Sequence, residues 1–124
     1  VCVVIAAGIT LHEALRAHEL LKKDGIAIRV VDCYSVKPID EAGLREAASR
    51  SKNRVIVVED HWIEGGLGDA VLGAFAEHGG VRVRKLAVTE LPHSGKPEEL
   101  LDLYGLSAPR IAAAVRAFVA EKAA

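Results

Sequence analysis

Residues 55–71 read VIVVEDHWIEGGLGDAV, and this stretch decides the fold of the chain. Its first four residues form an uninterrupted apolar run, which is typical of a buried strand, and the residues beyond Gly68 return to helical spacing. Gly65, Gly66 and Gly68 therefore mark a corner between a strand and a helix. Because open α/β sheets carry functional groups at the carboxyl ends of their strands, we expect the candidate site at this corner.

Strands and helices are predicted to alternate on both sides of the glycine corner. Apolar runs predict four strands, over residues 1–7, 26–33, 55–59 and 81–89, and the last is polar enough to lie near a sheet edge. Helical spacing predicts five helices, which begin near Thr10, Asp40, Leu67, Glu98 and Ser107, the third of them reaching residues 79–80. This alternation predicts one α/β domain, residues 1–124, with a mostly parallel sheet and helices on both faces.

Four of the predicted helices begin with residue types that suit a helix start. Thr10 and Glu13 match a capping box, in which each side chain accepts an amide proton of the first turn. Asp40 and Ser107 suit the position before a helix, and Pro97 suits a first turn.

Composition argues against several classes of protein. The chain has 124 residues, of which 51% are hydrophobic and 27% charged, and its formal net charge is −1. Lys and Arg are scattered among acids, so neither nucleic acid nor a membrane surface is expected as a partner, because both require concentrated positive charge. No apolar run approaches the roughly 20 residues of a membrane span. Cys2 and Cys33 are predicted to be buried, reduced thiols of a cytoplasmic protein.

The glycine corner has two competing interpretations. Backbone amides at a glycine-rich helix start can bind an anion, because they are unpaired and the helix dipole is positive there. Acidic side chains crowd this corner and would repel an anion, so glycines that serve a tight turn and close packing are favoured. The candidate residues for an interface or an anion-binding turn are Glu59, Asp60, His61, Trp62, Ile63, Gly65, Gly66 and Gly68.

Trp62 and Ile63 form a bulky apolar pair in a predicted exposed loop. Exposed aromatic surface more often marks contact with a partner than a solvated site, so this pair predicts a protein interface. His61 follows Asp60, but adjacent residues usually point apart, and no nucleophile elbow is present. His61 is therefore predicted to be a surface or interface residue.

The remaining histidines and one loop are not expected to carry chemistry. His12, His18, His78 and His93 lack the spacing of a metal site, and His18 lies on an apolar helical stripe where a core histidine is usual. The loop at residues 94–96 reads SGK but lacks the full spacing of a phosphate-binding loop. The sequence thus predicts no catalytic, cofactor-binding or metal-binding residue on this chain.

Several short segments occur in an order that resembles one known domain. They are AAGITLHEAL at residues 6–15, SVKPID at 35–40, VEDH at 58–61, EGGLG at 64–68, SGKPEELL at 94–101 and YGL at 104–106. Over essentially its whole length the chain resembles the C-terminal domain of transketolase. The glycine corner is shared with the β subunits of 2-oxoacid dehydrogenases and with deoxyxylulose-phosphate synthase, whereas SGKPEELL is similar to transketolase proper.

The resemblance implies a three-layer α/β/α domain with a mixed sheet of about five strands, in which the first strand runs antiparallel to the others. Whole transketolases of the pentose phosphate pathway transfer a two-carbon ketol unit between sugar phosphates, with thiamine diphosphate and Mg²⁺. Members of the family hold these cofactors in the two preceding domains. The chain matches neither the diphosphate-and-metal motif nor the activating glutamate. The resemblance therefore implies a chain that is inactive alone and that binds no cofactor itself.

The implied partners are the remaining transketolase domains or a complementary subunit, within a homodimer. The chain begins inside an apolar run, which favours a piece of a longer protein. Two alternatives stay open. One is the equivalent domain of another thiamine-dependent enzyme, whose corner at residues 61–68 contacts a lipoyl-carrier partner. The other is a regulatory module that binds a small anion at residues 65–68.

Overall fold

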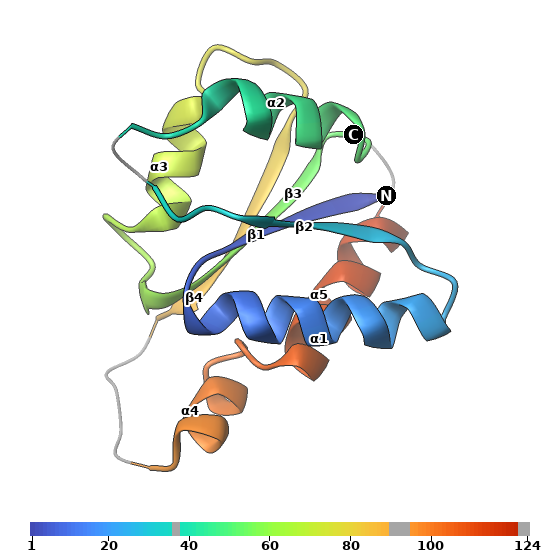
Figure 1. Ribbon diagram of the computed structural model, residues 1–124, viewed down its shortest axis with the longest axis vertical. Helices are drawn as coiled ribbons and strands as arrows, with labels where there is room; N and C mark the ends of the chain where they lie inside the picture. The colour runs from blue at the N-terminus through green and yellow to red at the C-terminus, as the bar shows by residue number, and fades with distance from the viewer. Residues whose placement is uncertain (36–37, 90–94, 122–124) are drawn as a thin grey trace.

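The computed structural model describes residues 1–35, 38–89 and 95–121. Strands and helices alternate as the sequence predicts (Figure 1). The elements are β1 (Cys2–Ala6), α1 (Ile9–Lys23), β2 (Ile28–Asp32), α2 (Glu41–Ser49), β3 (Arg54–Trp62), α3 (Leu67–Ala74), β4 (Arg82–Val88), α4 (Pro97–Leu103) and α5 (Ala108–Ala120). Within these described residues, no helix has the length and apolar character needed to cross a membrane. His93 and the start of the SGK loop lie outside them.

The strands form one parallel sheet in the order β2-β1-β3-β4. Each connection between consecutive strands passes through a helix, and such a crossover returns the chain in the same direction. The α/β class and the mostly parallel sheet are therefore confirmed, with four strands in the described part of the chain where about five were expected. The antiparallel first strand that the resemblance implies is wrong for β1, which runs parallel to both of its neighbours.

Helices cover the sheet on both sides, which confirms the three-layer α/β/α arrangement. Cys2, Val4 and Ala6 of β1 belong to an apolar cluster with side chains of α1 and α5, whereas Val3 and Ile5 belong to a cluster with side chains of α2 and α3. Successive side chains of a strand point to opposite faces, so the two clusters lie on opposite sides of the sheet. Figure 1 shows α2 and α3 on one side and α1 and α5 on the other.

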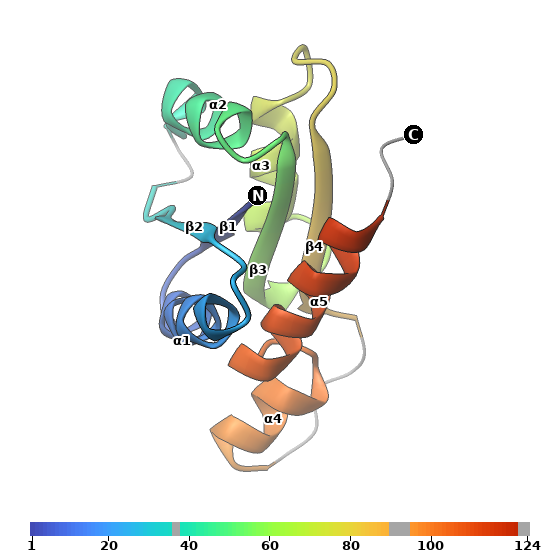
Figure 2. The ribbon, with the colours of Figure 1, turned by 90° about the vertical axis from the view of Figure 1, so that its right-hand side faces the viewer.

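The strand predicted to be an edge strand, β4, is confirmed at the edge of this sheet. Its Arg82 and Arg84 both donate to the carboxylate of Glu121, at 2.6 Å each. Both guanidinium groups also lie over the ring of Phe118, at 4.9 and 4.4 Å from its centroid. The hydrogen bonds from Arg84 and Arg82 lower the pKa of Glu121. The polar residues of β4 thus hold the end of α5 beside the strand (Figure 2).

Two predicted helix starts are confirmed. The side chain of Asp40 accepts the N–H of Gly43 at 3.0 Å and so caps α2. Pro97 lies in the first turn of α4, where its missing N–H is no loss. Helix α3 is shorter than predicted, because the chain passes into hydrogen-bonded turns after Ala74.

The capping box predicted for α1 is wrong. Thr10 lies inside the helix, and its buried hydroxyl is 2.9 Å from the carbonyl oxygens of Ala7 and Val58. The carboxylate of Glu13 accepts the N–H of Ala108 at 2.9 Å instead of an amide of its own helix. Both side chains therefore join α1 to other elements, Thr10 to β3 and Glu13 to the start of α5.

The side-chain cap predicted at Ser107 is also wrong. Ser107 precedes α5, but its hydroxyl donates to the carboxylate of Asp102 at 2.8 Å. The first amide of α5 is satisfied by Glu13, which lies far away in the sequence. A cap supplied by another helix leaves no local pattern to recognise.

Cys2 and Cys33 are free and buried, as predicted. Burial raises the pKa of the Cys2 thiol to about 11. This thiol therefore stays protonated near neutral pH and packs as a small apolar side chain.

Replacing Glu13 by alanine is expected to destabilise the fold by about 1 to 3 kcal/mol, because the buried N–H of Ala108 would lose its acceptor. Glu13→Gln keeps an acceptor oxygen and should lose less. Urea unfolding measures both free energies. The control is Glu19→Ala on the same helix, where the exposed carboxylate should be worth less than about 0.5 kcal/mol. Equal losses for the two alanine variants would contradict the cap.

Candidate functional site

The corner after β3 begins later than the sequence predicts. Trp62 pairs with Val88 of β4 after a register shift, and the N–H of Ile63 donates to the carbonyl oxygen of Val88 at 3.0 Å. Residues 60–62 therefore belong to β3, and the loop predicted for Trp62 is wrong. The strand is longer because β4 continues beside it and supplies partners for its backbone. The turn itself is confined to residues 63–66.

Glu59 lies beneath the corner with its side chain only 4% exposed. One carboxylate oxygen, Oε2, accepts the N–H of Gly68 in the first turn of α3. The other oxygen, Oε1, has no hydrogen-bond partner within residues 1–35, 38–89 and 95–121. Burial raises the pKa of Glu59, and the bond from Gly68 opposes part of this shift. Glu59 thus ties β3 to α3 through a carboxyl group that is costly to ionise.

The glycines leave room for this carboxyl group. A Cβ atom at Gly66 would lie 2.1 Å from Oε1 of Glu59, and one at Gly68 would lie 2.9 Å from Oε2. Gly65 has a φ of 79°, which side-chain-bearing residues rarely adopt. Each of the three predicted glycines is therefore explained by a tight turn over a buried acid.

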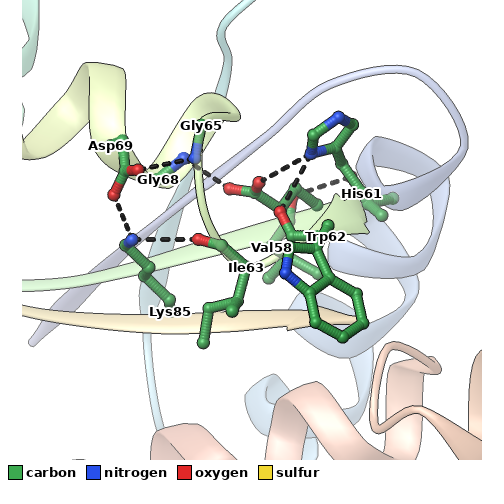
Figure 3. A network of polar contacts seen from close by, with 10 residues as sticks. Val58, His61, Trp62, Ile63, Gly65, Gly68, Asp69 and Lys85 are labelled. Atoms are coloured by element: carbon green, nitrogen blue, oxygen red, sulfur yellow. Dashed lines mark hydrogen bonds and ion pairs between the residues drawn. The ribbon is translucent and has the colours of Figure 1, made fainter. Parts of the chain in front are cut away.

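Lys85 of β4 closes the other side of the corner (Figure 3). Its Nζ donates to the carbonyl oxygen of Ile63 at 3.0 Å and to the carboxylate of Asp69. Asp69 also accepts the N–H of Gly65 at 2.6 Å. The bond from Lys85, followed by the bond from Gly65, lowers the pKa of Asp69. Lys85 could not be singled out from the sequence, because a lysine in an edge strand is usually a solvated one.

Two backbone amides of the corner already have acceptors from the protein. The N–H of Gly65 bonds to Asp69 and the N–H of Gly68 bonds to Glu59. An anion at this turn would compete with both carboxylates for these donors. The arrangement therefore favours glycines that serve a tight turn and close packing over an anion-binding turn.

His61 and Trp62 lie on the outside of the corner, whereas Glu59 lies beneath it. The side chain of His61 is 61% exposed and Trp62 is 43% exposed, while Ile63 is partly buried. Nδ1 of His61 is 2.9 Å from the carbonyl oxygen of Trp62 and 3.9 Å from Oε1 of Glu59. The exposed surface predicted for this stretch is thus provided mainly by Asp60, His61 and Trp62.

The other described histidines are scattered. His18 is partly exposed and lies 3.4 Å from the carboxylate of Glu19, so the predicted core histidine is wrong. His78 lies near the ring of Phe75, with 6.4 Å between the ring centroids. In the part of the chain that the structure describes, no group of three or more His, Cys, Asp or Glu side chains could hold a metal ion.

A separate hollow of about 450 Å³ lies at the carboxyl end of β2 and is lined by Cys33, Tyr34 and residues at the start of α2. Burial raises the pKa of the Cys33 thiol. The Asp40 carboxylate beside it is engaged as the cap of α2. None of the predicted corner residues lines this hollow.

Comparison with known proteins places the chain in a family. Residues 1–111 match the family model described as transketolase, C-terminal domain. The chain belongs to this transketolase family. Transketolase-like protein 2 of Mus musculus is 51% identical over 113 residues, which cover 91% of this chain and 18% of that protein. The transketolases of Mus musculus and Homo sapiens are each 49% identical over 116 residues, which cover 94% of this chain and 19% of each relative.

Solved structures agree with this assignment of a transketolase C-terminal domain. A split-gene transketolase, described as an inactive beta4 tetramer, matches with a TM-score of 0.87 and 39% identity over 95% of this chain and 39% of that chain. A transketolase from Campylobacter jejuni matches with a TM-score of 0.61 over 94% of this chain and 16% of its own, and at 18% identity it supports the fold alone. The chain spans about a fifth of the length of its curated relatives. The resemblance inferred from the sequence motifs is confirmed.

Gly66→Ala is expected to destabilise the domain by about 1 to 3 kcal/mol, because the new methyl group would displace the buried carboxyl group of Glu59. The matched control is Gly73→Ala in α3, where a Cβ atom would meet nothing within 4 Å. That control should stabilise the fold by about 0.5 to 1 kcal/mol, since alanine favours helix. Urea unfolding measures the change in the free energy of unfolding for both variants. Changes of the same sign would contradict the close approach of Gly66 to the carboxyl group of Glu59.

The contribution of Glu59 to the free energy of unfolding is expected to decrease as pH rises. Burial raises its folded-state pKa above the ordinary value of 4.5, so the folded chain binds this proton more tightly than the unfolded chain does. The contribution of Glu59 is therefore most favourable below that value and falls as pH rises from there through the folded-state pKa. Unfolding free energies of wild type and Glu59→Gln, measured between about pH 4 and about pH 7, isolate this effect. A wild-type minus variant difference that stays constant, or that grows with pH, would refute it.

Proposed function

We propose that this chain serves as the C-terminal domain, or C-terminal subunit, of a transketolase that transfers a two-carbon ketol unit between sugar phosphates. In this proposal residues 1–124 form one domain that supports the dimer without carrying out chemistry. The observation that carries it is the 49% identity to transketolases over 94% of the chain. Because the chain matches only 19% of these relatives, binding of thiamine diphosphate and Mg²⁺ is assigned to the rest of the enzyme.

The charged groups of the glycine corner support a structural role. Glu59 and Asp69 each accept an amide N–H of the turn or of the helix that follows it, and Lys85 donates to a carbonyl oxygen of the turn. A general acid or base must reach the reacting group of a substrate. These three side chains reach the backbone of their own domain instead.

Trp62 supports contact with a partner, because a large aromatic side chain that is 43% exposed offers much apolar area to another surface. The proposed partners are the remaining transketolase domains or a complementary subunit, in a homodimeric, cytoplasmic enzyme of the pentose phosphate pathway. The match to a split-gene transketolase supports the subunit arrangement. The scattered charges do not favour nucleic acid or membrane as a partner.

The two alternatives have less support. A domain of a 2-oxoacid dehydrogenase or of deoxyxylulose-phosphate synthase would share the glycine corner, but the identities of 49 to 51% are to transketolases and transketolase-like proteins. A regulatory module for small anions needs free amides at residues 65–68. The amides of Gly65 and Gly68 donate to carboxylates of the chain.

The proposal is tested by a chimera in which this chain replaces the corresponding segment of the Mus musculus transketolase, to which it is 49% identical. The chimera is expected to transfer the ketol unit and to bind thiamine diphosphate with Mg²⁺ in calorimetry, whereas the chain alone should do neither. Stoichiometric binding of thiamine diphosphate by the chain alone would contradict the proposal. A folded chimera without activity would do the same.

The role of Trp62 is tested in this chimera by sedimentation at increasing concentration. Trp62→Ala is expected to weaken dimer formation by about ten-fold or more, as loss of a buried aromatic anchor usually does. Leu72→Ala is the matched control, because Leu72 is an apolar residue of similar exposure, 41%, that lies in α3 and not in the exposed end of β3. Equal effects of the two variants would remove Trp62 from the interface.

A further inference from the structure

The hollow at the carboxyl end of β2 has an apolar floor, and we call it the Tyr34 hollow. Its floor consists of four side chains of the apolar cluster between the sheet and α2 and α3: Val31, Cys33, Ile39 and Leu44. Cys33 and Leu44 are buried, whereas Val31 and Ile39 are only partly covered. Core side chains therefore reach the surface here, in a hollow of about 450 Å³.

Hydrogen bonds hold the lining of the Tyr34 hollow in place. The N–H of Cys33 donates to the carbonyl oxygen of Ala6 in β1 at 2.9 Å. The hydroxyl of Ser35 donates to the carbonyl oxygen of Pro38 at 2.7 Å, which joins the two ends of the connection between β2 and α2. The cap at Asp40 fixes the start of α2. Little of this lining needs to be ordered when a ligand binds, which favours binding.

Tyr34 lines the same hollow but lies almost wholly in water. It is 86% exposed, more than any other large apolar or aromatic residue that the structure describes. A tyrosine supplies a large contact area and has only two side-chain torsions to order, so it loses little entropy when a partner covers it. The ring can therefore cover an aliphatic side chain that enters the hollow.

Acidic side chains give the Tyr34 hollow a negative charge. Asp32 and Asp40 both line it, and Asp32 is exposed and forms no ion pair with a residue in the described ranges. Burial, followed by the charges of Asp32 and Asp40, raises the pKa of the Cys33 thiol on the floor. A segment that fills this hollow is therefore expected to carry positive charge beside its apolar side chain, because complementary charges favour association.

We propose that the Tyr34 hollow binds a segment of a partner protein, other than the transketolase domains, in which an aliphatic side chain lies beside a lysine or arginine. The aliphatic side chain packs on Ile39 and Leu44, the ring of Tyr34 covers it, and the basic group lies near Asp32. None of the glycine-corner residues lines the hollow. This surface is therefore separate from the Trp62 contact that is proposed for assembly of the enzyme.

Binding is tested in the chain alone with acetyl-lysyl-leucyl-lysine amide, called the leucine probe. Methyl NMR resonances of Val31, Ile39 and Leu44 report on the floor of the hollow. The leucine probe is expected to give saturable shifts. Binding should be about ten-fold weaker when serine replaces its leucine, and about three-fold weaker when glutamine replaces both lysines. Equal binding of the three probes, or no shift at these methyl groups with any of them, would overturn the proposal.

Two variants of the chain test the rim of the hollow. Tyr34→Ala is expected to weaken binding of the leucine probe about five-fold, and Asp32→Asn to remove the preference for lysine over glutamine. Both residues are exposed, so both variants should fold. The matched controls are Trp62→Ala and Asp60→Asn, at exposed positions of β3 that do not line the hollow. A control that weakens binding as much as its matched variant would contradict the proposal.

Other occupants of the hollow give different results. The leucine probe should also bind the chimera with the Mus musculus transketolase. Failure there, with binding to the chain alone intact, would show that the rest of the enzyme covers the hollow and would overturn the proposal. Self-association of the chain that Tyr34→Ala abolishes would assign the hollow to a second copy, with the same consequence. The probe experiments require neither ketol transfer nor dimer formation, so they stand apart from the tests of the proposed function.

Discussion

The buried carboxyl group of Glu59 determines the structure of the glycine corner between β3 and α3. Its Oε2 needs a hydrogen-bond donor, and the N–H of Gly68 supplies one. That approach requires that no side chain grow from Gly66 or Gly68, because either Cβ atom would overlap the carboxyl group. The acid and the glycines are therefore one physical unit. Lys85 and Asp69 complete it by holding the turn from the opposite side.

The sequence predicted the architecture wherever an apolar pattern extended over a whole strand or helix. The unbroken apolar run of β1 predicts a strand covered on both faces, and the helices between strands predict their parallel direction. The helix caps were less predictable. Thr10, Glu13 and Ser107 are residue types that suit a cap, yet their side chains bond to distant or neighbouring partners that only the packed fold brings together. The antiparallel first strand came from the family resemblance and does not apply to β1.

The glycine corner between a strand and a helix was predicted from the sequence, but which of its residues are buried and which are exposed was not. Extension of β3 to Trp62 depends on the backbone of Val88, which the local sequence does not reveal. Within that extended strand, Glu59 is buried whereas Asp60 to Trp62 are exposed. Lys85 forms the ion pair with Asp69, but it lies in β4, whose sequence indicates only a polar edge strand. The residues alone lead to an α/β domain with a glycine corner between β3 and α3, and the identity of the domain rests on the motifs shared with transketolase.

The position of β1 in the sheet has a consequence for how this domain folds during translation. β1 precedes both of its neighbours in the chain, and Val3 pairs with Arg29 on one side and with Val55 on the other. Neither edge of this apolar segment can be satisfied locally, because no hairpin forms. A ribosome must release the chain through Val58 before β1 can pair with both neighbouring strands. Until then the nascent chain exposes an apolar segment with unpaired backbone groups, which is the kind of surface that molecular chaperones shield from aggregation.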